Sequence, residues 1–348
     1  MSRRMKAAVF EGPEKLIVKE VELARCGSDD IIIKVHACGI CGGDIRNFYN
    51  GLRHGVKSQI MGHEFTGTVS EVGANVTKFK VGDKVAAAPD VSCGECYYCK
   101  RGWVNLCENH KMIGTHWPGG FAEYVHIPAL VLRRGFIHPV PEGVSLDAAC
   151  LSEPASSVIA SMENAHVSLG DSVLIIGDGP IGCLFIEIAR ANGASKIIMA
   201  GRMRRQERVK KFKPDLLIDA SASDVATRVR EFTSGLGVDV AVCANPVVAT
   251  QEQAVQSVRK RGRVILFGGV PKNAPMTSLN SNTIHYNEIE VAGAFSYEVR
   301  HHLAALAAIQ KGLLTPDNYF TKVVALEDVA EGFVSAKTGK NLKILVKP

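Results

Sequence analysis

Four cysteines, Cys93, Cys96, Cys99 and Cys107, lie close together with two, two and seven residues between them. Four thiolates at such spacing can close a tetrahedron around zinc, which is typical of a structural site. The iron–sulfur pattern nearest to it ends in a three-residue gap followed by proline, whereas here the gap is seven and Glu108 follows. A disulfide framework is not favoured either, because ten cysteines in 348 residues are dilute and no secretory segment is recognisable. The pattern therefore predicts a structural zinc lobe over residues 93–107.

A second group of residues has the chemistry of an open metal site. Cys41 lies in Gly-Ile-Cys-Gly-Gly-Asp and is followed by His63 and Glu64 in Gly-His-Glu-Phe. A thiolate, an imidazole and a carboxylate leave a coordination position free, as catalytic zinc requires. Such a zinc binds an alcohol oxygen and stabilises the alkoxide from which a hydride leaves. Glu153 is a further candidate that ligates the metal or hydrogen-bonds its water, and Asp44 is expected to orient the imidazole.

The other thiols and imidazoles are expected to be structural, since a lone cysteine usually behaves as a small core hydrophobe. These are Cys26, Cys38, Cys150, Cys183 and Cys243, and the histidines include His110, His116, His301 and His302.

Residues 177–182 read Gly-Asp-Gly-Pro-Ile-Gly, with the spacing G-x-G-x-x-G. The motif follows an apolar run at residues 173–176 and opens an apolar helical pattern at residues 181–191, which is the context that supports a dinucleotide site. Its glycines allow a tight turn and close approach of the backbone to a pyrophosphate, and the helix N-terminus supplies N–H donors. The predicted cofactor-binding residues of this turn are Gly177, Gly179, Pro180, Ile181 and Gly182.

About 20 residues further on, a carboxylate would be expected to hold the adenosine ribose of NAD. Instead the strand pattern ends in Gly201, and Arg202, Arg204 and Arg205 follow. Guanidinium groups without a nearby carboxylate suit a ribose 2′-phosphate, so the sequence predicts that NADP is preferred over NAD. The remaining basic residues, up to Lys213, are expected to form a solvated helix face rather than a nucleic-acid contact.

The elements that must position these groups fall into two patterns. Up to about residue 150 the chain has short strands and turns, at residues 31–33, 67–69 and 82–85, which indicate a compact antiparallel barrel. From about residue 155, apolar strands at 173–176, 196–200, 216–219, 238–243 and 263–267 alternate with helical patterns that include 226–232 and 250–259. This alternation predicts a parallel, doubly wound sheet. A strand is expected at residues 342–346, returning to the first domain.

The bulk composition is that of a globular chain of more than one domain, with 348 residues, 46% hydrophobic and 22% charged. The net charge of +6 is modest. No apolar stretch has the length of a membrane span, and no signal peptide is recognisable. We expect a cytoplasmic, reducing location, in which thiolates stay available for metal, and no membrane or nucleic-acid partner.

The chain resembles the zinc-dependent medium-chain dehydrogenases, and within them the L-iditol/sorbitol (polyol) dehydrogenase branch. The resemblance covers essentially the whole chain and rests on the motifs GICGGD, GHEFTG, VGDKV, CGECYYC, GGFAEYV, EPAS, GDGPIG and FGG. It implies an α/β fold, with a GroES-like β-barrel catalytic domain over residues 1–154, a Rossmann domain over 155–292 and a C-terminal segment, 293–348, that returns to the catalytic domain.

The resemblance also implies site residues and an activity. It implies catalytic zinc at Cys41, His63, Glu64 and Glu153, structural zinc at the four clustered cysteines, and nicotinamide-side contacts at Val270, Phe295 and Lys343. The implied activity is NAD(P)-linked interconversion of a secondary alcohol or polyol and its ketone. The implied oligomer is a homotetramer, or else a dimer, and residues 290–292 are a candidate strand for extending the Rossmann sheet across a two-fold axis.

Three positions depart from the pattern of that family. Gly43 replaces the Ser or Thr that begins the usual proton relay, Arg46 replaces a histidine, and Ser296 follows Phe295 where the sorbitol enzymes tend to have arginine. Proton release is therefore expected through water, through Glu64 or Glu153, or through a substrate hydroxyl. The alternatives are a threonine-type or simple alcohol dehydrogenase of the same fold, a non-catalytic NADPH-binding or redox-sensing protein, and a zinc-ribbon nucleic-acid binder. The last lacks an aromatic stacking platform.

Overall fold

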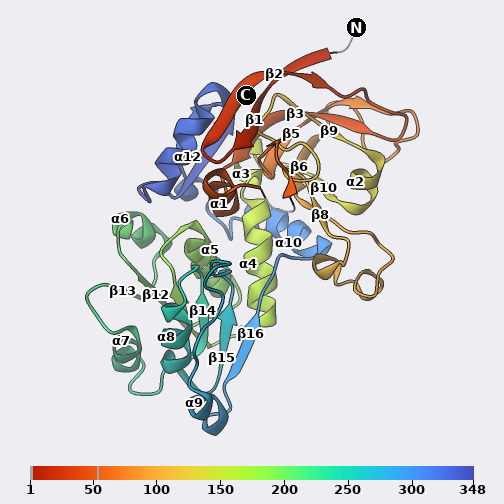
Figure 1. Cartoon of the computed structure of the whole chain (residues 1–348). Coiled ribbons are helices and arrows are strands. Elements are labelled where there is room, and N and C mark those ends of the chain that lie inside the picture. The colour runs from red at the N-terminus through yellow and green to blue at the C-terminus, as the bar shows by residue number, and fades with distance from the viewer. Residues whose placement is uncertain (1–2, 53–54) are drawn as a thin grey trace. The chain divides into compact units, whose positions relative to one another are not determined.

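The computed structural model of the chain describes residues 3–52 and 55–348 (Figure 1). The chain forms two compact units, which are called here the first unit, Met1–Ser156 with Tyr297–Pro348, and the second unit, Ser157–Ser296. The first division of the chain falls within helix α4, Ser152–Asn164.

The first unit is built mainly from antiparallel strands. Its largest sheet has the order β10-β6-β5-β3-β18-β17, with β9 paired to β3, and a smaller sheet has the order β2-β1-β4. The strands are β1 Arg3–Gly12, β2 Lys15–Leu23, β3 Ile31–Gly39, β4 Gln59–Ile60, β5 Glu64–Val72, β6 Lys84–Ala88, β7 Asp90–Val91, β8 Lys111–Met112, β9 Tyr124–Ile127, β10 Phe136–Pro139, β17 Phe320–Ala325 and β18 Lys343–Lys347. The helices are α1 Gly42–Asn50, α2 Ala129–Arg134, α3 Leu146–Ala149, α10 Val299–Gln310, α11 Pro316–Tyr319 and α12 Val329–Lys337.

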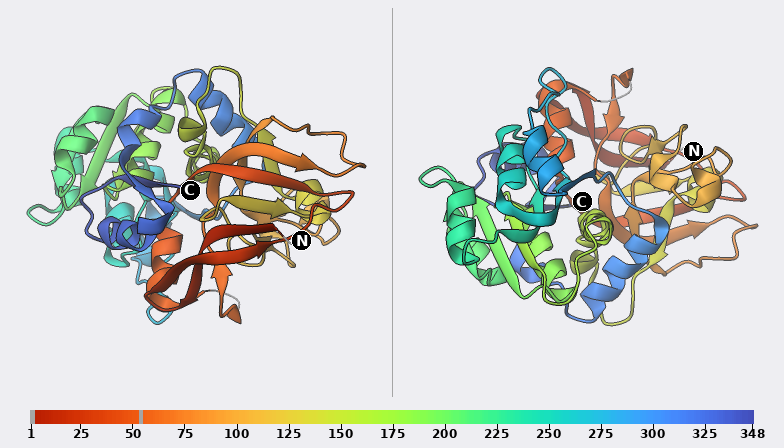
Figure 2. Two further views of the ribbon diagram at one scale, coloured as in Figure 1. Left: turned by 90° about the horizontal axis from the view of Figure 1, so that it is seen from above. Right: turned by 90° about the horizontal axis from the view of Figure 1, so that it is seen from below.

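The C-terminal strand β18 belongs to the N-terminal barrel. It pairs antiparallel with β3 at Leu345 and Gly39 and parallel with β17, so the blue end of the chain lies beside red and orange strands in Figure 2. Three consecutive isoleucines of β3, from Ile31, are all almost fully buried, which a barrel strand covered on both faces explains. This pairing brings Lys343 next to residues that are about 280 positions earlier in the chain.

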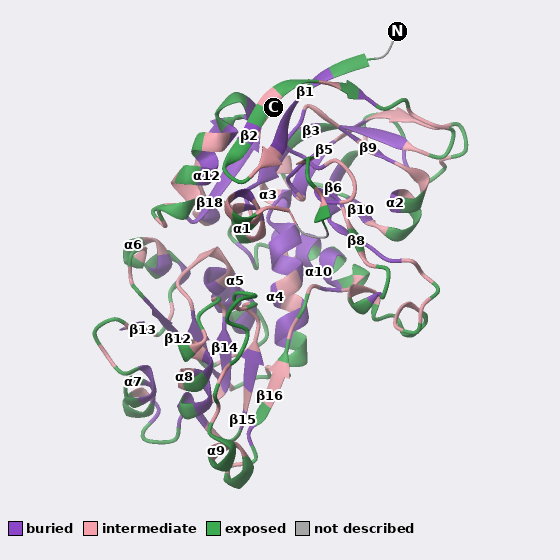
Figure 3. Cartoon of the chain, viewed as in Figure 1, coloured by how far each residue is buried: buried purple, intermediate pink, exposed green. Residues whose placement is uncertain are grey.

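The second unit contains a six-stranded parallel sheet in the order β13-β12-β11-β14-β15-β16. Its strands are β11 Ser172–Ile176, β12 Lys196–Gly201, β13 Leu216–Asp219, β14 Val238–Cys243, β15 Val258–Leu266 and β16 Glu290–Gly293, and its helices are α5 Pro180–Ala191, α6 Gln206–Val209, α7 Val225–Phe232, α8 Ala249–Ser257 and α9 Ser281–Tyr286. The central strand β11 is buried along its whole length, and its neighbour β14 is mostly buried as well (Figure 3), as expected where helices cover both faces of a parallel sheet. The order is that of a doubly wound dinucleotide-binding fold.

The α/β fold predicted from the sequence is thus confirmed, with two local differences. The expected strand at residues 263–267 begins earlier, at Val258, because buried Val258 pairs in parallel with Val238 and ends the preceding helix at Ser257. In the first unit, Gly82 has a φ of +95° and forms a turn, so the strand expected from residue 82 begins at Lys84.

Among the residues described, no helix has the length and apolar character needed to span a membrane.

Candidate metal and cofactor sites

Cys41 is the N-cap residue of α1, and the cap fixes its thiol. Its Sγ accepts a hydrogen bond from the backbone N–H of Gly43 at 3.4 Å. In return, Oδ2 of buried Asp44 accepts from the Cys41 backbone N–H at 3.1 Å. The other carboxylate oxygen, Oδ1, lies 3.2 Å from Nδ1 of His63. One carboxylate therefore holds two candidate metal ligands and leaves Nε2 of the imidazole available.

The electrostatic setting of His63 follows from these contacts. Burial alone would lower its pKa, but the nearby charges of Asp44 and Cys41 raise it well above the ordinary value. Gly62, just before it, has a φ of +93°, and a Cβ there would lie 2.8 Å from Sγ of Cys38. Only glycine fits at this position of the turn. The turn also fixes the backbone position from which the His63 side chain extends.

Glu64 begins β5 and is fully buried, with 0% exposure. Its Oε1 accepts a hydrogen bond from Nζ of Lys343 at 2.6 Å. The ammonium also forms an ion pair with Oε2 at 2.5 Å, so Lys343 contacts both oxygens of this carboxylate. A Cβ on Gly39 would collide with Oε2, so the glycine leaves the space that this oxygen occupies. Burial would lower the pKa of Lys343, but Glu64 and Cys41 raise it above its ordinary value.

Cys41, His63 and Glu64 together have the donor set of a zinc site. One ligand atom from each lies within 4.8 Å of the others. The thiolate, imidazole and carboxylate types match those that zinc accepts, so these residues fit the metal that the sequence predicts.

Glu153 occupies a different environment from Glu64. It is 8% exposed, and its Oε1 accepts a hydrogen bond from the hydroxyl of buried Tyr297 at 2.7 Å. Burial raises the pKa of Glu153 to about 7, although His63 and the Tyr297 hydroxyl act in the opposite direction. The structure thus places this carboxyl near the imidazole and ties it to a tyrosine that sequence reasoning did not single out.

The four clustered cysteines converge on one point, and all are free thiols. Sγ of Cys93 lies 3.9 Å from Sγ of Cys99, and Sγ of Cys96 lies 4.0 Å from Sγ of Cys107. These separations are close to the roughly 3.8 Å edge of a tetrahedron with 2.3 Å zinc–sulfur bonds and far from a disulfide length. The backbone N–H groups of Glu95 and Cys96 lower the pKa of Cys93 to about 6. The lobe itself consists of loops and two short 3-10 turns, Cys99–Arg101 and Val104–Leu106.

The glycine-rich turn joins β11 to α5 in the second unit. Gly177 has a φ of +137°, and a Cβ on Gly182 would collide with the carbonyl oxygen of Gly177. Gly179 is the N-cap of α5, and Pro180 takes the first helical position, where its missing N–H has no consequence. The free N–H groups of this helix end suit a pyrophosphate.

At the end of β12, buried Gly201 is followed by exposed Arg202 and Arg204 and by half-buried Arg205. Burial lowers the pKa of Arg205, while the attraction of Asp178 raises it. Among the other predicted cofactor residues, Val270 is half-buried and Phe295 is 58% exposed, both in the second unit. Lys343, by contrast, belongs to the first unit and pairs with Glu64.

Family models match both parts of the chain. The alcohol dehydrogenase GroES-like domain matches residues 27–142, and the zinc-binding dehydrogenase domain matches residues 180–311. The chain belongs to the zinc-dependent medium-chain dehydrogenase family, in its polyol branch. It is an alcohol dehydrogenase of that family, and the resemblance inferred from its motifs is confirmed.

Three relatives of this dehydrogenase illustrate the similarity. A D-arabitol-phosphate dehydrogenase from Enterococcus avium is 33% identical, with 100% of this chain and 98% of that protein covered. A sorbitol dehydrogenase from Bacillus subtilis is 32% identical, with 99% and 98% covered. Among solved structures, one from Sinorhizobium meliloti, described as a zinc-binding dehydrogenase bound to NADP, has a TM-score of 0.91 and 28% identity over 99% of this chain and 100% of that one.

Several neighbours of the dehydrogenase's site residues were not predicted. Tyr297 and Gly39 are far in sequence from the carboxylates they contact, and no local pattern marks them. The partner of Lys343 was also missed, since only the pairing of β18 with β3 brings it to Glu64. The one signal available was the lysine itself, a charge inside an otherwise apolar strand pattern.

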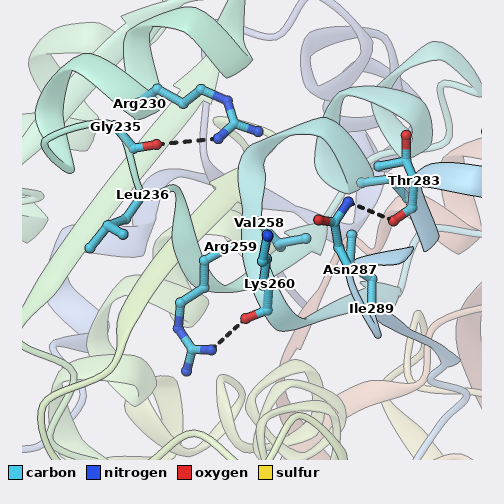
Figure 4. Close-up of a pocket in the computed structure, with 10 residues that line it drawn as sticks. Arg230, Gly235, Leu236, Val258, Arg259, Lys260, Thr283, Asn287 and Ile289 are labelled. Carbon is cyan, nitrogen blue, oxygen red and sulfur yellow. Dashed lines mark hydrogen bonds between the residues drawn. The ribbon is translucent and has the colours of Figure 1, made fainter. Parts of the chain in front are cut away.

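A pocket of about 350 Å³ in the second unit of the dehydrogenase (Figure 4) is lined by residues outside the glycine-rich turn. Its lining includes Arg230, Arg259, Lys260, Thr283 and Asn287. The two guanidinium groups already bond to protein: Arg230 donates to the carbonyl of Gln256 at 2.8 Å, and Arg259 donates to Asp239 at 2.6 Å. Because both guanidinium groups already donate hydrogen bonds to protein acceptors, the pocket is a poor site for a phosphate.

Proposed function

We propose that this dehydrogenase uses zinc and NAD(P)⁺ to oxidise a secondary alcohol of a polyol to the ketone, and catalyses the reverse reduction. The observation that carries the proposal is the convergence of Cys41, His63 and Glu64, each of which offers one ligand atom within 4.8 Å of the others. Zinc held there would supply a Lewis acid for the alcohol oxygen. The four-cysteine lobe would hold a second, structural zinc.

The experiment for this proposal combines metal analysis with a substrate panel. Fully loaded protein should contain two zinc ions per chain. Polyols, amino alcohols and short alcohols should be tested with NAD⁺ and NADP⁺ side by side, and polyols should give the highest kcat/KM. A preference for threonine would favour the threonine-type alternative, and no turnover of any alcohol would favour a non-catalytic cofactor-binding protein.

The chain's own residues must move the proton of the alcohol. Gly43 offers no hydroxyl, so the relay that begins with Ser or Thr in related enzymes is absent here. Glu153 is the best-placed alternative, because it is buried, lies near the imidazole of His63 and has a pKa near neutrality. We propose that Glu153 accepts this proton through a water, with Tyr297 holding the carboxyl in place.

We also propose that NADP is preferred over NAD. Residue 201 is glycine and has no carboxylate, and Arg202 and Arg205 follow the end of the strand. A hydrogen bond between charged groups contributes about 1.5–3 kcal/mol, so one such contact to the 2′-phosphate gives roughly tenfold to hundredfold preference. The NADP in the Sinorhizobium structure is consistent with this. A ratio of kcat/KM values near one would refute the preference.

The substrate candidate favoured by a specific observation is a polyol monophosphate. Nη2 of Arg46 lies 3.9 Å from the place that a Cβ of residue 43 would occupy, and Sγ of Cys41 lies 3.7 Å from the same place. The Arg46 guanidinium and a candidate zinc ligand are thus both neighbours of position 43, and a guanidinium suits an anionic substrate group. The D-arabitol-phosphate dehydrogenase relative supports the same class.

The test of this candidate compares a polyol with its monophosphate. Arg46→Gln should lower kcat/KM for the phosphorylated substrate by on the order of tenfold and leave the uncharged polyol nearly unaffected. Equal effects on both substrates would exclude a phosphate contact by Arg46.

The assembly that we propose is a homotetramer or a dimer. Within the described residues, strand β16 is at the edge of its sheet and pairs with β15 alone, so its outer edge is available to a second copy. Sedimentation of the loaded protein measures this. Because the thiolates must stay reduced to bind metal, we also propose a cytoplasmic location.

A further inference from the structure

Asp178, the second residue of the glycine-rich turn, lies directly against Gly201 at the end of β12. A Cβ on Gly201 would be 2.6 Å from both Cβ and Cγ of Asp178 and 2.9 Å from its Oδ1. Such contacts are too short for any side chain at position 201 unless Asp178 moves. The strand end that carries a ribose-binding carboxylate in many dinucleotide folds is therefore occupied by a carboxylate from the preceding turn.

One oxygen of the Asp178 carboxylate accepts no hydrogen bond from the part of the chain that the structure describes. Its Oδ2 is buried, and within residues 3–52 and 55–348 it has no hydrogen-bond partner. The half-buried guanidinium of Arg205 is attracted by the negative charge of Asp178. Arg204 and Arg208 repel the Arg205 guanidinium, whereas Asp178 and Cys183 attract it, Asp178 more strongly. An acceptor left unbonded beside a cofactor turn is available to a hydroxyl of the ligand.

We infer that Asp178 is the carboxylate that faces the adenosine ribose, and that it opposes the preference for NADP set by Arg202 and Arg205. The inference rests on the proposed dinucleotide function of this turn. A carboxylate accepts a hydrogen bond from the 2′-hydroxyl of NAD and repels the 2′-phosphate of NADP, whose charge is near −2. Arg205, shared between Asp178 and a phosphate, offsets only part of that repulsion. The dehydrogenase should therefore bind both cofactors, with NADP favoured less than the arginines alone would give.

The test measures the dissociation constants of NADH and NADPH by fluorescence titration of the zinc-loaded protein. Asp178→Asn should raise the affinity ratio in favour of NADPH by on the order of tenfold relative to the wild type, through weaker NADH binding and tighter NADPH binding. Glu207→Gln is the matched control, because it removes one exposed carboxylate from the same basic segment. Glu207 pairs with Lys210, and this variant should leave the ratio unchanged.

The outcomes separate the two ideas. The ratio in the wild type tests the proposed NADP preference, and the change caused by Asp178→Asn tests the role of Asp178. An unchanged ratio in a folded Asp178→Asn protein overturns the inference, as does an equal change in the Glu207→Gln control. Asp178→Ala, which removes the carboxylate altogether, provides a second variant if the asparagine protein does not fold.

Discussion

At the scale of single residues, the candidate zinc site depends on side chains that contact the ligands. Asp44 bonds the backbone of Cys41 and lies against the imidazole of His63, while Lys343 balances the charge of Glu64. A buried carboxylate without a partner would favour protonation. Lys343 instead gives the buried Glu64 carboxylate a cationic partner next to the other candidate ligands.

Cys41→Ala is expected to abolish turnover while the protein stays folded, because it removes a ligand of the proposed catalytic zinc and leaves the core intact. The loss of the N-cap contact to Gly43 should cost about 1 kcal/mol. Zinc content should fall from two ions to one, measured beside circular dichroism. Cys26→Ala, which removes a half-buried thiol outside both clusters, should keep both ions. Full activity of Cys41→Ala would contradict the assignment.

Glu153→Gln is expected to lower kcat by about 10²–10⁴-fold, the usual contribution of a general acid–base group, with little change in cofactor affinity. Tyr297→Phe should act differently. Its hydroxyl donates to the carboxylate and favours the charged form, so its removal should raise the pKa of Glu153 and move the acidic limb of the kcat profile to higher pH. Tyr49→Phe serves as the control. An unmoved limb in Tyr297→Phe would remove the tyrosine from this role.

At the scale of elements, a chain of hydrogen bonds joins β10, α10 and α4. The hydroxyl of Ser152 donates to the carbonyl of Ala149 at 2.7 Å, so it accepts from Nε2 of His302 at 2.9 Å. Nδ1 of His302 must then accept from Nδ1 of His138 at 2.7 Å. His302 must therefore be neutral, because only an unprotonated Nδ1 can accept a hydrogen bond. The network precedes Glu153 in α4 and fixes the start of that helix.

This network predicts a loss of stability in acid. Burial lowers the pKa of His138 to about 4 and that of His302 to about 3, whereas an unfolded histidine titrates near 6.5. The unfolded state therefore binds more protons as the pH falls below about 6.5, and the free energy of unfolding decreases, by about 1 kcal/mol or more per histidine at pH 5.5. Urea unfolding at pH 7.5 and 5.5 measures the difference.

A double variant, His138→Gln with His302→Gln, should lose less stability between these two pH values than the wild type, whatever its stability at pH 7.5. His36→Gln removes an exposed histidine that contacts Asp147 and should keep the wild-type difference. The idea fails if the double variant and the wild type show the same pH dependence.

Elements and site residues differ in how far the sequence determines them. The turn at Gly177–Gly182 and its flanking strand and helix follow from local periodicity and glycine chemistry, and so do the clustered cysteines. The pair of Glu64 and Lys343 does not, because 278 residues separate its partners and only the pairing of β18 unites them. Gly201 was interpreted as room for a phosphate. The structure shows that it also makes room for Asp178, and no local pattern encodes this contact between the glycine-rich turn and the end of β12.

At the scale of the whole molecule, each proposed ligand belongs to one unit. Both proposed zinc sites lie in the first unit, whereas the glycine-rich turn and the arginines lie in the second. A ligand stabilises the structure that binds it, by about 2.7 kcal/mol at 100 times its dissociation constant. Unfolding of such a protein need not be two-state, so zinc and cofactor should stabilise different transitions.

The two tryptophans make this measurable, since Trp103 and Trp117 both belong to the first unit. Tryptophan fluorescence therefore reports unfolding of the first unit alone, while circular dichroism reports both units. Removal of zinc with a chelator should lower the fluorescence midpoint, because the Cys93–Cys107 lobe and the Cys41 site lose their metal. NADP⁺ should instead raise the part of the dichroism transition that fluorescence does not detect. If chelator and NADP⁺ shift both signals equally, the units unfold as one and this assignment of ligands to separate transitions is wrong.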